Sequence, residues 1–241
     1  MRFRLMTWNI HKGIGGVDRS YRPQRIIDAI AHCDPDIAML QEVDDGVPRS
    51  RFHRQVDFLG DALKLPHRAY QRNVKLSKGH YGNAILSRFP LHDVSNLDLT
   101  IPLKKKRRGL CAHCRLRIDG KTRSLVLFNC HLGLAAFERR MQLRRFVDSD
   151  QVKHTRKSTP FIICGDFNDV WGNLGRQILE SANFRLVAKS TKTFPAILPV
   201  RPLDRICCRG DIEIKHSFAS RTKITRQASD HLPLVADFSI E

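Results

Sequence analysis

Short apolar runs alternate along the chain with longer stretches in which apolar residues recur at helical spacing. In residues 2–10, Phe3 and Leu5 fall on one face and Met6 and Trp8 on the other, which is the period of a β-strand. The same reading predicts further strands at residues 37–43, 81–87, 91–99, 110–118, 124–130, 160–165, 203–208, 212–218 and 233–240.

Three stretches are predicted to be helical. Pro23 opens the first, and Ile26, Ile27 and Ile30 form its apolar face. The other two occupy residues 52–65 and 137–152. Strands and helices are mixed along the whole length, with no linker or repeat between them. This pattern predicts one α/β domain over residues 1–241, with helices covering sheets.

Composition adds a strong charge bias to this picture. The 241 residues are 41% hydrophobic and 27% charged, which is typical of a globular chain and excludes a disordered one. The formal net charge is +18, which favours a polyanionic partner: nucleic acid, an anionic lipid surface or a phosphorylated solute. Residues 101–160 hold 16 Lys and Arg against 4 Asp and Glu, a net charge of +12. The basic run at residues 104–108 is either a solvated loop or a polyanion contact.

The seven cysteines do not form a disulfide or zinc pattern. An odd number in a chain of this size argues against a disulfide scaffold. Cys111, His113 and Cys114 resemble zinc ligands, but strand alternation puts the two cysteines on opposite faces, which argues against a shared ion. Arg2 and Arg4 interrupt the apolar start of the chain, so no signal peptide is expected. We expect a reduced, cytoplasmic protein, with attachment to a membrane surface as an alternative.

Polar residues gather where the apolar runs end. Glu42 follows the apolar run 37–40, and an acid at the end of a buried strand needs a partner. Asp166 and Asn168 could simply form a turn. The full set contains carboxylates, amides and histidines but no conspicuous Ser or Cys nucleophile. That inventory suits a hard divalent cation and attack by water. Its members are Asn9, His11, Gln41, Glu42, Asn83, Asn129, His131, Asp166, Asn168, Asp169, Asp230 and His231.

The order of the motifs resembles the endonuclease/exonuclease/phosphatase superfamily, which includes DNase I and exonuclease III-type enzymes. The resemblance covers residues 3 to 240 and is closest to small, stand-alone bacterial members. The motifs are Thr-Trp-Asn-Ile at 7–10, Leu-Gln-Glu-Val at 40–43, Gly-Asn-Ala-Ile-Leu-Ser-Arg at 82–88, His-Leu-Gly at 131–133, Gly-Asp-Phe-Asn-Asp at 165–169, Leu-Asp-Arg-Ile at 203–206 and Ser-Asp-His at 229–231.

The resemblance implies a DNase I-like four-layer α/β sandwich of two packed sheets flanked by helices. It also implies cleavage of a phosphate ester with Mg²⁺ or Mn²⁺. By motif, Glu42 is implied as the main metal ligand, with Asn9 beside it and Asp230 close to the ion.

The catalytic roles are also carried over by motif. His231 is implied to pair with Asp204 and to act either as general base or as a cationic hydrogen-bond donor. Asp166 is implied to position or deprotonate the attacking water. Asn168 and His131 are implied as donors to the non-bridging oxygens.

The substrate stays open between classes. We expect Asn83, His11, Arg108 and Arg139 to contact it. Nucleic acid is favoured, because a basic surface gives sequence-independent phosphate affinity. The alternative is a phospholipid headgroup or small phosphate ester. The apolar stretch 194–200 is then an interfacial loop, although core packing is the expected state. A third alternative is a non-catalytic binding protein on the same fold. We expect a monomer.

Overall fold

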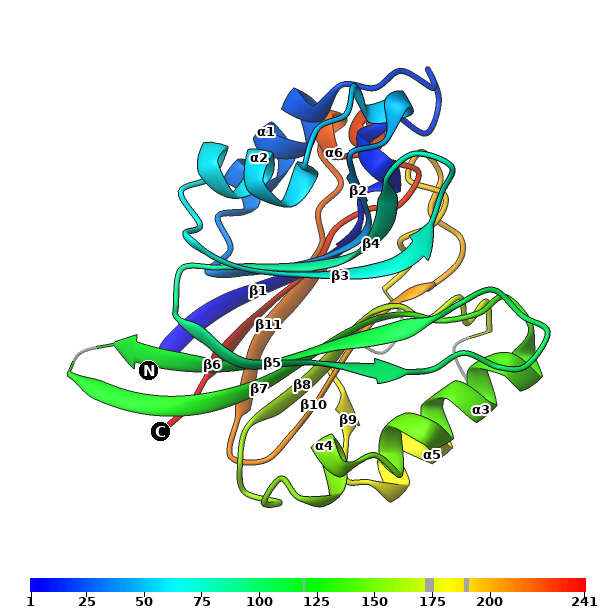
Figure 1. The fold of residues 1–241 in the computed structure, drawn as a ribbon. Coiled ribbons are helices and arrows are strands. Elements are labelled where there is room, and N and C mark those ends of the chain that lie inside the picture. The colour runs from blue at the N-terminus through cyan, green and yellow to red at the C-terminus, as the bar shows by residue number, and fades with distance from the viewer. Residues whose placement is uncertain (119, 172–175, 189–190) are drawn as a thin grey trace.

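Two mixed β-sheets pack face to face, with helices on their outer faces (Figure 1). The computed structural model describes residues 1–118, 120–171, 176–188 and 191–241. In this part of the chain the first sheet has the order β11-β12-β1-β2-β4-β3, and the second has the order β5-β6-β7-β8-β10-β9. The strands are β1 (Arg2–Asn9), β2 (Ile37–Asp45), β3 (His67–Lys75), β4 (His80–Ser87), β5 (Leu91–Asp98), β6 (Arg108–Ile118), β7 (Lys121–His131), β8 (Phe161–Asp166), β9 (Arg185–Leu186), β10 (Asp204–Arg209), β11 (Glu213–Ala219) and β12 (Leu234–Ser239).

The helices complete the predicted four layers. One set covers the first sheet: α1 (Pro23–Cys33), α2 (Gln55–Ala62) and α6 (Lys223–Ala228). The other covers the second sheet: α3 (Ala136–Val147), α4 (Asp150–Lys153) and α5 (Arg176–Ser181). One apolar core lies between the sheets, and a further core lies under each set of helices. The four-layer α/β sandwich is therefore confirmed.

Strand alternation sorts side chains between these cores. In β1, Phe3 and Leu5 enter the core between the sheets, and Met6 and Trp8 enter the core under α1, as the sequence pattern predicts. β1 and β2 pair in parallel, with α1 crossing between them. The carboxyl ends of both strands therefore lie at the same edge of the sheet.

Several predicted elements needed correction. β3 was missed, because its buried positions include the polar Gln71 rather than a run of apolar residues. The helix predicted over residues 52–65 begins only at Gln55, since Arg51 and Phe52 have positive φ values of 55° and 60°. The helix predicted over residues 137–152 is two helices, α3 and α4. The extended backbone of Ser149, with ψ 155°, separates them.

Buried amides connect the two sheets near their carboxyl ends. Asn129 of β7 donates hydrogen bonds of 2.9 Å to the carbonyls of Leu40 and Ala84 in the first sheet. Its own Oδ1 accepts a bond of 2.7 Å from Gln41. Because the bonded groups are all buried, losing one partner would leave a polar atom unsatisfied in the core. This network fixes the relative position of the sheet ends that carry the candidate site.

The apolar stretch 194–200 was expected in the core, and that expectation is wrong for three of its residues. The side chains of Ile197, Leu198 and Val200 are 53%, 71% and 52% exposed. The backbones of Phe194 and Arg201 bond to each other, which closes a tight turn and directs its tip away from the core. No described helix of the structure is long and apolar enough to cross a membrane.

Candidate active site

The strand register of the second sheet brings three predicted residues side by side. His131 ends β7 and pairs with Asp166 at the end of the parallel strand β8. Asp166 in turn pairs with Asp204, the first residue of the antiparallel strand β10. All three side chains are buried. Two carboxylates and an imidazole are thus concentrated at one edge of the sheet.

Gly165 is required for this arrangement. Its φ is +140°, a conformation that L side chains rarely adopt. A Cβ atom there would lie 1.8 Å from the carbonyl oxygen of Cys130. The glycine therefore lets β8 approach β7 closely, one residue before Asp166.

His231 is held from several sides. Its Nδ1 lies 2.8 Å from Asp204 Oδ2, which also accepts a hydrogen bond of 2.5 Å from Thr193 Oγ1. The indole Nε1–H of Trp8 donates to the backbone carbonyl of His231 at 2.8 Å. The ring of Phe194 packs against the imidazole, with centroids 4.9 Å apart. These contacts fix the direction in which the Nε2 of His231 points.

The surroundings of His231 favour its charged form. Burial opposes protonation, but the negative charges of Asp204 and Asp166 outweigh it and raise the pKa of His231 to about 10. The Nε2 atom lies 3.8 Å from Asp166 Oδ2. At neutral pH this histidine is therefore an imidazolium held between two carboxylates.

Asp166 is the central carboxylate of the group. Its Oδ2 accepts a hydrogen bond of 3.0 Å from Asn9 Nδ2 and lies 3.4 Å from His131 Nε2. Its Oδ1 accepts the backbone N–H of Asn168 at 2.9 Å. Burial raises the pKa of Asp166 to about 6, although the His231 charge opposes this. A carboxyl group with this pKa exchanges protons near neutral pH.

Glu42 does not end its strand as predicted. β2 continues to Asp45, and its pairing with β4 shifts between Leu40 and Val43. Glu42 lies in this β-bulge with a φ of 56°. A bulge redirects a side chain that a regular strand would point elsewhere. The carboxylate forms an ion pair with the ammonium of Lys12.

The cations around Glu42 keep it ionised. Burial opposes ionisation, but the charges of His131, Lys12 and His11 lower the pKa of Glu42 to about 2. His131 itself is driven toward neutrality. Burial takes its pKa well below 6.5, and the positive charge of Arg107 lowers it further. Lys12 is therefore the cation that stabilises Glu42 at neutral pH.

The donor set fits a hard divalent cation. Glu42 already binds a cationic group, the Lys12 ammonium. Carboxylate and amide oxygens from Glu42, Asn9 and Asp230 are the ligand type that Mg²⁺ prefers. The Ser229 hydroxyl donates to the Asn9 carbonyl at 2.7 Å and lies 3.4 Å from Asp230 Oδ1, which brings two of these residues together. Asp166, Asp204 and His231 form a second, fully buried group with potential ligand atoms within 4.8 Å of one another.

The remaining residues predicted in this region lie beside the cluster. The Nδ1 atom of His11 lies 2.9 Å from the Ile14 carbonyl and 4.0 Å from Asp230 Oδ1. Asn168 has a φ of 50° and donates one side-chain N–H to the Leu132 carbonyl at 2.9 Å. The geometry thus places His11 toward Asp230 and ties Asn168 to the end of β7.

Two of the expected substrate contacts are occupied elsewhere. Asn83 is fully buried between the sheets and donates hydrogen bonds of 3.1 Å to Gln71 Oε1 and the Arg108 carbonyl. Arg139 is buried on α3 and donates to the Leu134 carbonyl. Their amide and guanidinium groups therefore satisfy protein acceptors. Arg108 is half-buried and lines a groove beside the site.

Sequence reasoning missed three residues that the fold brings to the cluster. Lys12 and Thr193 contact Glu42 and Asp204 as described above. Arg107 is only 8% exposed, and its charge acts on both His131 and Tyr81. Arg107 belongs to the basic run 104–108, but the sequence pattern does not show that it is buried while Lys104, Lys105 and Lys106 are exposed and Arg108 is half-buried.

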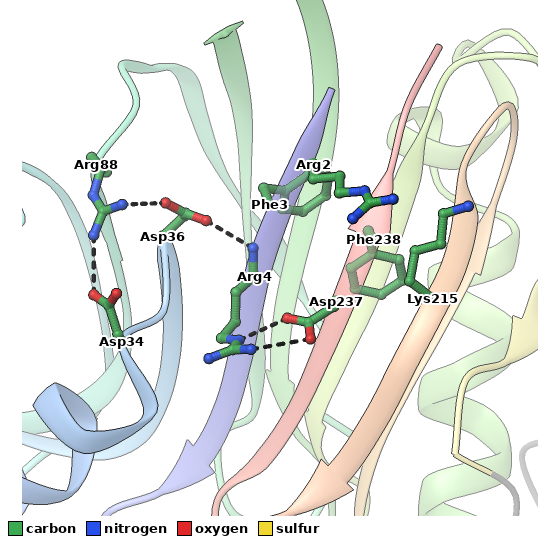
Figure 2. A pocket seen from close by; sticks show the side chains of 9 residues that line it. All are labelled: Arg2, Phe3, Arg4, Asp34, Asp36, Arg88, Lys215, Asp237 and Phe238. Atoms are coloured by element: carbon green, nitrogen blue, oxygen red, sulfur yellow. Dashed lines mark hydrogen bonds and ion pairs between the residues drawn. The ribbon is translucent and has the colours of Figure 1, made fainter.

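A separate hollow of about 430 Å³ lies where β1 begins, at the other end of that strand from Asn9 (Figure 2). Two of its four basic residues pair with carboxylates of the same lining. Arg4 bonds both oxygens of Asp237, at 2.7 and 3.1 Å, and Arg88 pairs with Asp34 and Asp36. Arg4 and Arg88 are therefore occupied by carboxylates, and we assign no anion site to this hollow.

Comparison with known proteins agrees with this geometry. The chain is 29% identical over 250 residues to the uncharacterized protein YbhP of Escherichia coli strain K12, covering 99% of this chain and 96% of YbhP. The fold is similar to that of an endonuclease/exonuclease/phosphatase from Beutenbergia cavernae, with a TM-score of 0.81, 20% identity and coverage of 99% and 72% of the two chains. It is also similar to the mannosyl-6-phosphatase Bt3783 of Bacteroides thetaiotaomicron, with a TM-score of 0.76, 17% identity and coverage of 99% and 100%.

The family assignment rests on a match over most of the chain. The model of the endonuclease/exonuclease/phosphatase family matches residues 6–231, from β1 to His231. Members of this family are hydrolases that act on phosphate esters. The sequence motifs, the two-sheet fold and the buried cluster agree with that match. The chain therefore belongs to the endonuclease/exonuclease/phosphatase family.

Proposed function

We propose that this protein is a divalent-metal-dependent phosphodiesterase that cleaves nucleic acid by in-line attack of water. The observation that carries the proposal is the buried group of His231, Asp204 and Asp166, in which an imidazolium stands between two carboxylates. A fixed cation in a water-poor site stabilises the charge that grows on phosphoryl oxygens during such a reaction. The whole chain is proposed to act as one domain.

Each side chain receives a role from its environment. His231 is protonated at neutral pH, so we assign it as the hydrogen-bond donor to the phosphate, rather than the general base. Asp166, with a pKa of about 6, is assigned to orient the attacking water and accept its proton. Asn168 and the neutral His131 are assigned as donors to the non-bridging oxygens. Removing one such donor costs about 2.7–4 kcal/mol of transition-state stabilisation.

Glu42, Asn9 and Asp230 are the residues proposed to hold Mg²⁺ or Mn²⁺. A bound cation supplies charge neutralisation at the phosphoryl oxygens and makes the attacking water more acidic. Glu42 stays ionised down to acidic pH because its pKa is about 2, so the carboxylate is available as a ligand. Lys12 pairs with one carboxylate oxygen of Glu42, Oε2, and we propose that it competes with the cation for this group.

A second candidate is a phosphodiesterase or phosphatase for lipid headgroups or small phosphate esters. The observation in its favour is the exposed apolar tip at Ile197, Leu198 and Val200, in the loop that also supplies Thr193 to Asp204. A mannosyl-6-phosphatase has a similar fold. The nucleic-acid assignment is preferred because residues 101–160 carry a net charge of +12 and supply His131 to the cluster.

The test is nicking of supercoiled plasmid by the purified protein with Mg²⁺, with EDTA as a parallel condition. We expect nicking by the parent, loss of nicking in EDTA and a strong loss in the His231→Ala protein. His154→Ala is the matched control, because His154 follows α4 and its side chain is 80% exposed, whereas that of His231 is buried. No nicking by the parent, with release of headgroup phosphate from phospholipid vesicles, would favour the second candidate.

A further inference from the structure

A basic groove of about 650 Å³ opens between the β3–β4 turn and the segment before β6. It is lined on its charged side by Arg72, Lys75, His80, Lys105, Lys106 and Arg108. Among the residues that the structure describes, no carboxylate lines it. Arg72 pairs with Asp45 at 3.3 Å, whereas Lys75, Lys105 and Lys106 make no ion pair with any carboxylate in the described part of the chain. The groove therefore keeps a net positive charge.

The inner end of the groove leads to the catalytic cluster through Tyr81. The Tyr81 ring lines the groove and lies 6.0 Å from the Lys12 ammonium, which binds Glu42. Burial raises the pKa of Tyr81, and the charge of Arg107 opposes that rise. The same Arg107 charge acts on His131. Arg107 directly precedes β6, whose Gly109 pairs with Cys130 next to His131, and it lies in the chain between the groove residues Lys106 and Arg108.

Arg107 is a buried cation without a protein counter-ion. Its side chain makes no hydrogen bond or ion pair with the residues that the structure describes, and its Nε has no partner. A buried charge is costly unless it is paired. Guanidinium groups bind phosphate through two parallel hydrogen bonds, which would supply the missing partner. The ligand that best satisfies Arg107 is therefore a phosphate group beside the cluster.

The rest of the lining fits the bases of an unpaired strand. Val74, Leu76 and Tyr81 provide apolar and aromatic surface among the cations. Asn73 is buried, and its Oδ1 has no hydrogen-bond partner in the structure. Single-stranded nucleic acid presents a charged backbone together with accessible base faces and N–H donors, whereas a duplex hides those faces. A lipid headgroup has no counterpart to a base.

We propose that this groove binds the nucleotides that flank the scissile bond of a single-stranded nucleic acid, with Arg107 contacting the phosphate at its inner end. The inference rests on the proposed function and names its substrate class. It follows that the protein prefers an oligonucleotide to a small phosphodiester. Binding should weaken steeply with salt, because each phosphate contact releases counter-ions.

The test is anisotropy of a labelled single-stranded 12-mer DNA, titrated in EDTA at several salt concentrations. Lys105→Ala/Lys106→Ala is the groove variant. We expect its Kd to rise roughly tenfold and its salt slope to fall by about 1.4, from two lost contacts at about 0.7 each. Lys121→Ala/Lys157→Ala is the matched control, because both lysines are exposed members of the same basic segment outside the groove. The control should bind like the parent.

Arg107→Met separates binding from folding. Because Arg107 is buried without a protein partner, we expect this variant to be at least as thermally stable as the parent while losing affinity for the 12-mer. A fall in Tm with unchanged affinity would overturn the role given to Arg107.

Equal loss of binding in the groove variant and the control would overturn the groove assignment. The groove assignment would also be overturned if Lys105 and Lys106 were needed for binding to phosphatidylglycerol vesicles and the protein did not bind the 12-mer.

Hydrolysis of bis(p-nitrophenyl) phosphate distinguishes failure of the groove assignment from failure of the proposed function. If the parent hydrolyses neither this diester nor the 12-mer with Mg²⁺, the proposed function fails. If it hydrolyses the 12-mer and the groove variant is unchanged, only the groove assignment fails.

Discussion

Replacing Asp204 by Asn tests the electrostatic description of His231 directly. The substitution keeps the size of the side chain but removes the negative charge 2.8 Å from Nδ1. Both side chains are buried, so solvent screens the interaction little. Asp166 remains 3.8 Å from Nε2, so one carboxylate still favours the imidazolium. The loss of charge stabilisation should therefore be large but incomplete.

The magnitude follows from these contacts. An opposite charge at this distance shifts a pKa by about 1 to 3, and burial then acts against the imidazolium with less opposition. We expect the pKa of His231 to fall from about 10 by roughly 2 to 3, equivalent to about 3–4 kcal/mol. At pH 8.5 the parent should hold the imidazolium, and the Asp204→Asn protein should hold mainly neutral imidazole.

The assay is NMR titration of the histidine Cε1–H signals in EDTA, with the His231 signal assigned from a His231→Gln spectrum. A His231 signal in the parent that titrates near pH 6.5 would refute the reasoning. So would a signal in the Asp204→Asn protein that still titrates near pH 10.

Unfolding by urea gives a second readout of the same linkage. The folded pKa of His231 is raised above its unfolded value, so its contribution is complete below about pH 6.5 and is lost as pH rises toward 10. The free energy of unfolding of the metal-free parent should therefore fall across this window. The Asp204→Asn protein should show a smaller fall, because less of the shift remains.

Two further predictions concern the ion pairs. If Lys12 and a divalent cation compete for Glu42, the Lys12→Ala protein should bind Mn²⁺ more tightly than the parent. Isothermal titration calorimetry should show a Kd lower by on the order of tenfold, which is about 1.4 kcal/mol. Equal or weaker binding would show that Lys12 does not compete. The Arg4→Ala substitution removes a partly exposed bidentate ion pair with Asp237 and a hydrogen bond of 2.9 Å to the Cys33 carbonyl. Urea unfolding should show a free energy of unfolding lower by about 1 kcal/mol, and catalysis should be unchanged. A loss of activity at equal stability would contradict the separation of the hollow at the start of β1 from the candidate active site.

Local patterning explains why much of the fold could be predicted from the sequence. The alternation in β1 sorted Phe3 and Leu5 from Met6 and Trp8 correctly, because adjacent side chains of a strand must point to opposite faces. Polar residues after buried runs marked His131 and Asp166, since strand ends are where polar groups can leave the core. The same local logic failed for β3, whose buried Gln71 bonds to the second sheet in a position where the pattern requires an apolar residue.

The sequence by itself determined the alternating layers, the family motifs and most of the candidate site residues. The tertiary structure decided how those residues act. The bulge that redirects Glu42 depends on pairing with β4, and the protonation of His231 depends on the burial of Asp204 and Asp166 beside it. Whether Arg107 is a solvated surface charge or a buried, unpaired cation depends on the packing of its loop. Burial and the arrangement of neighbouring charges set protonation, and no local pattern along the chain encodes either of them.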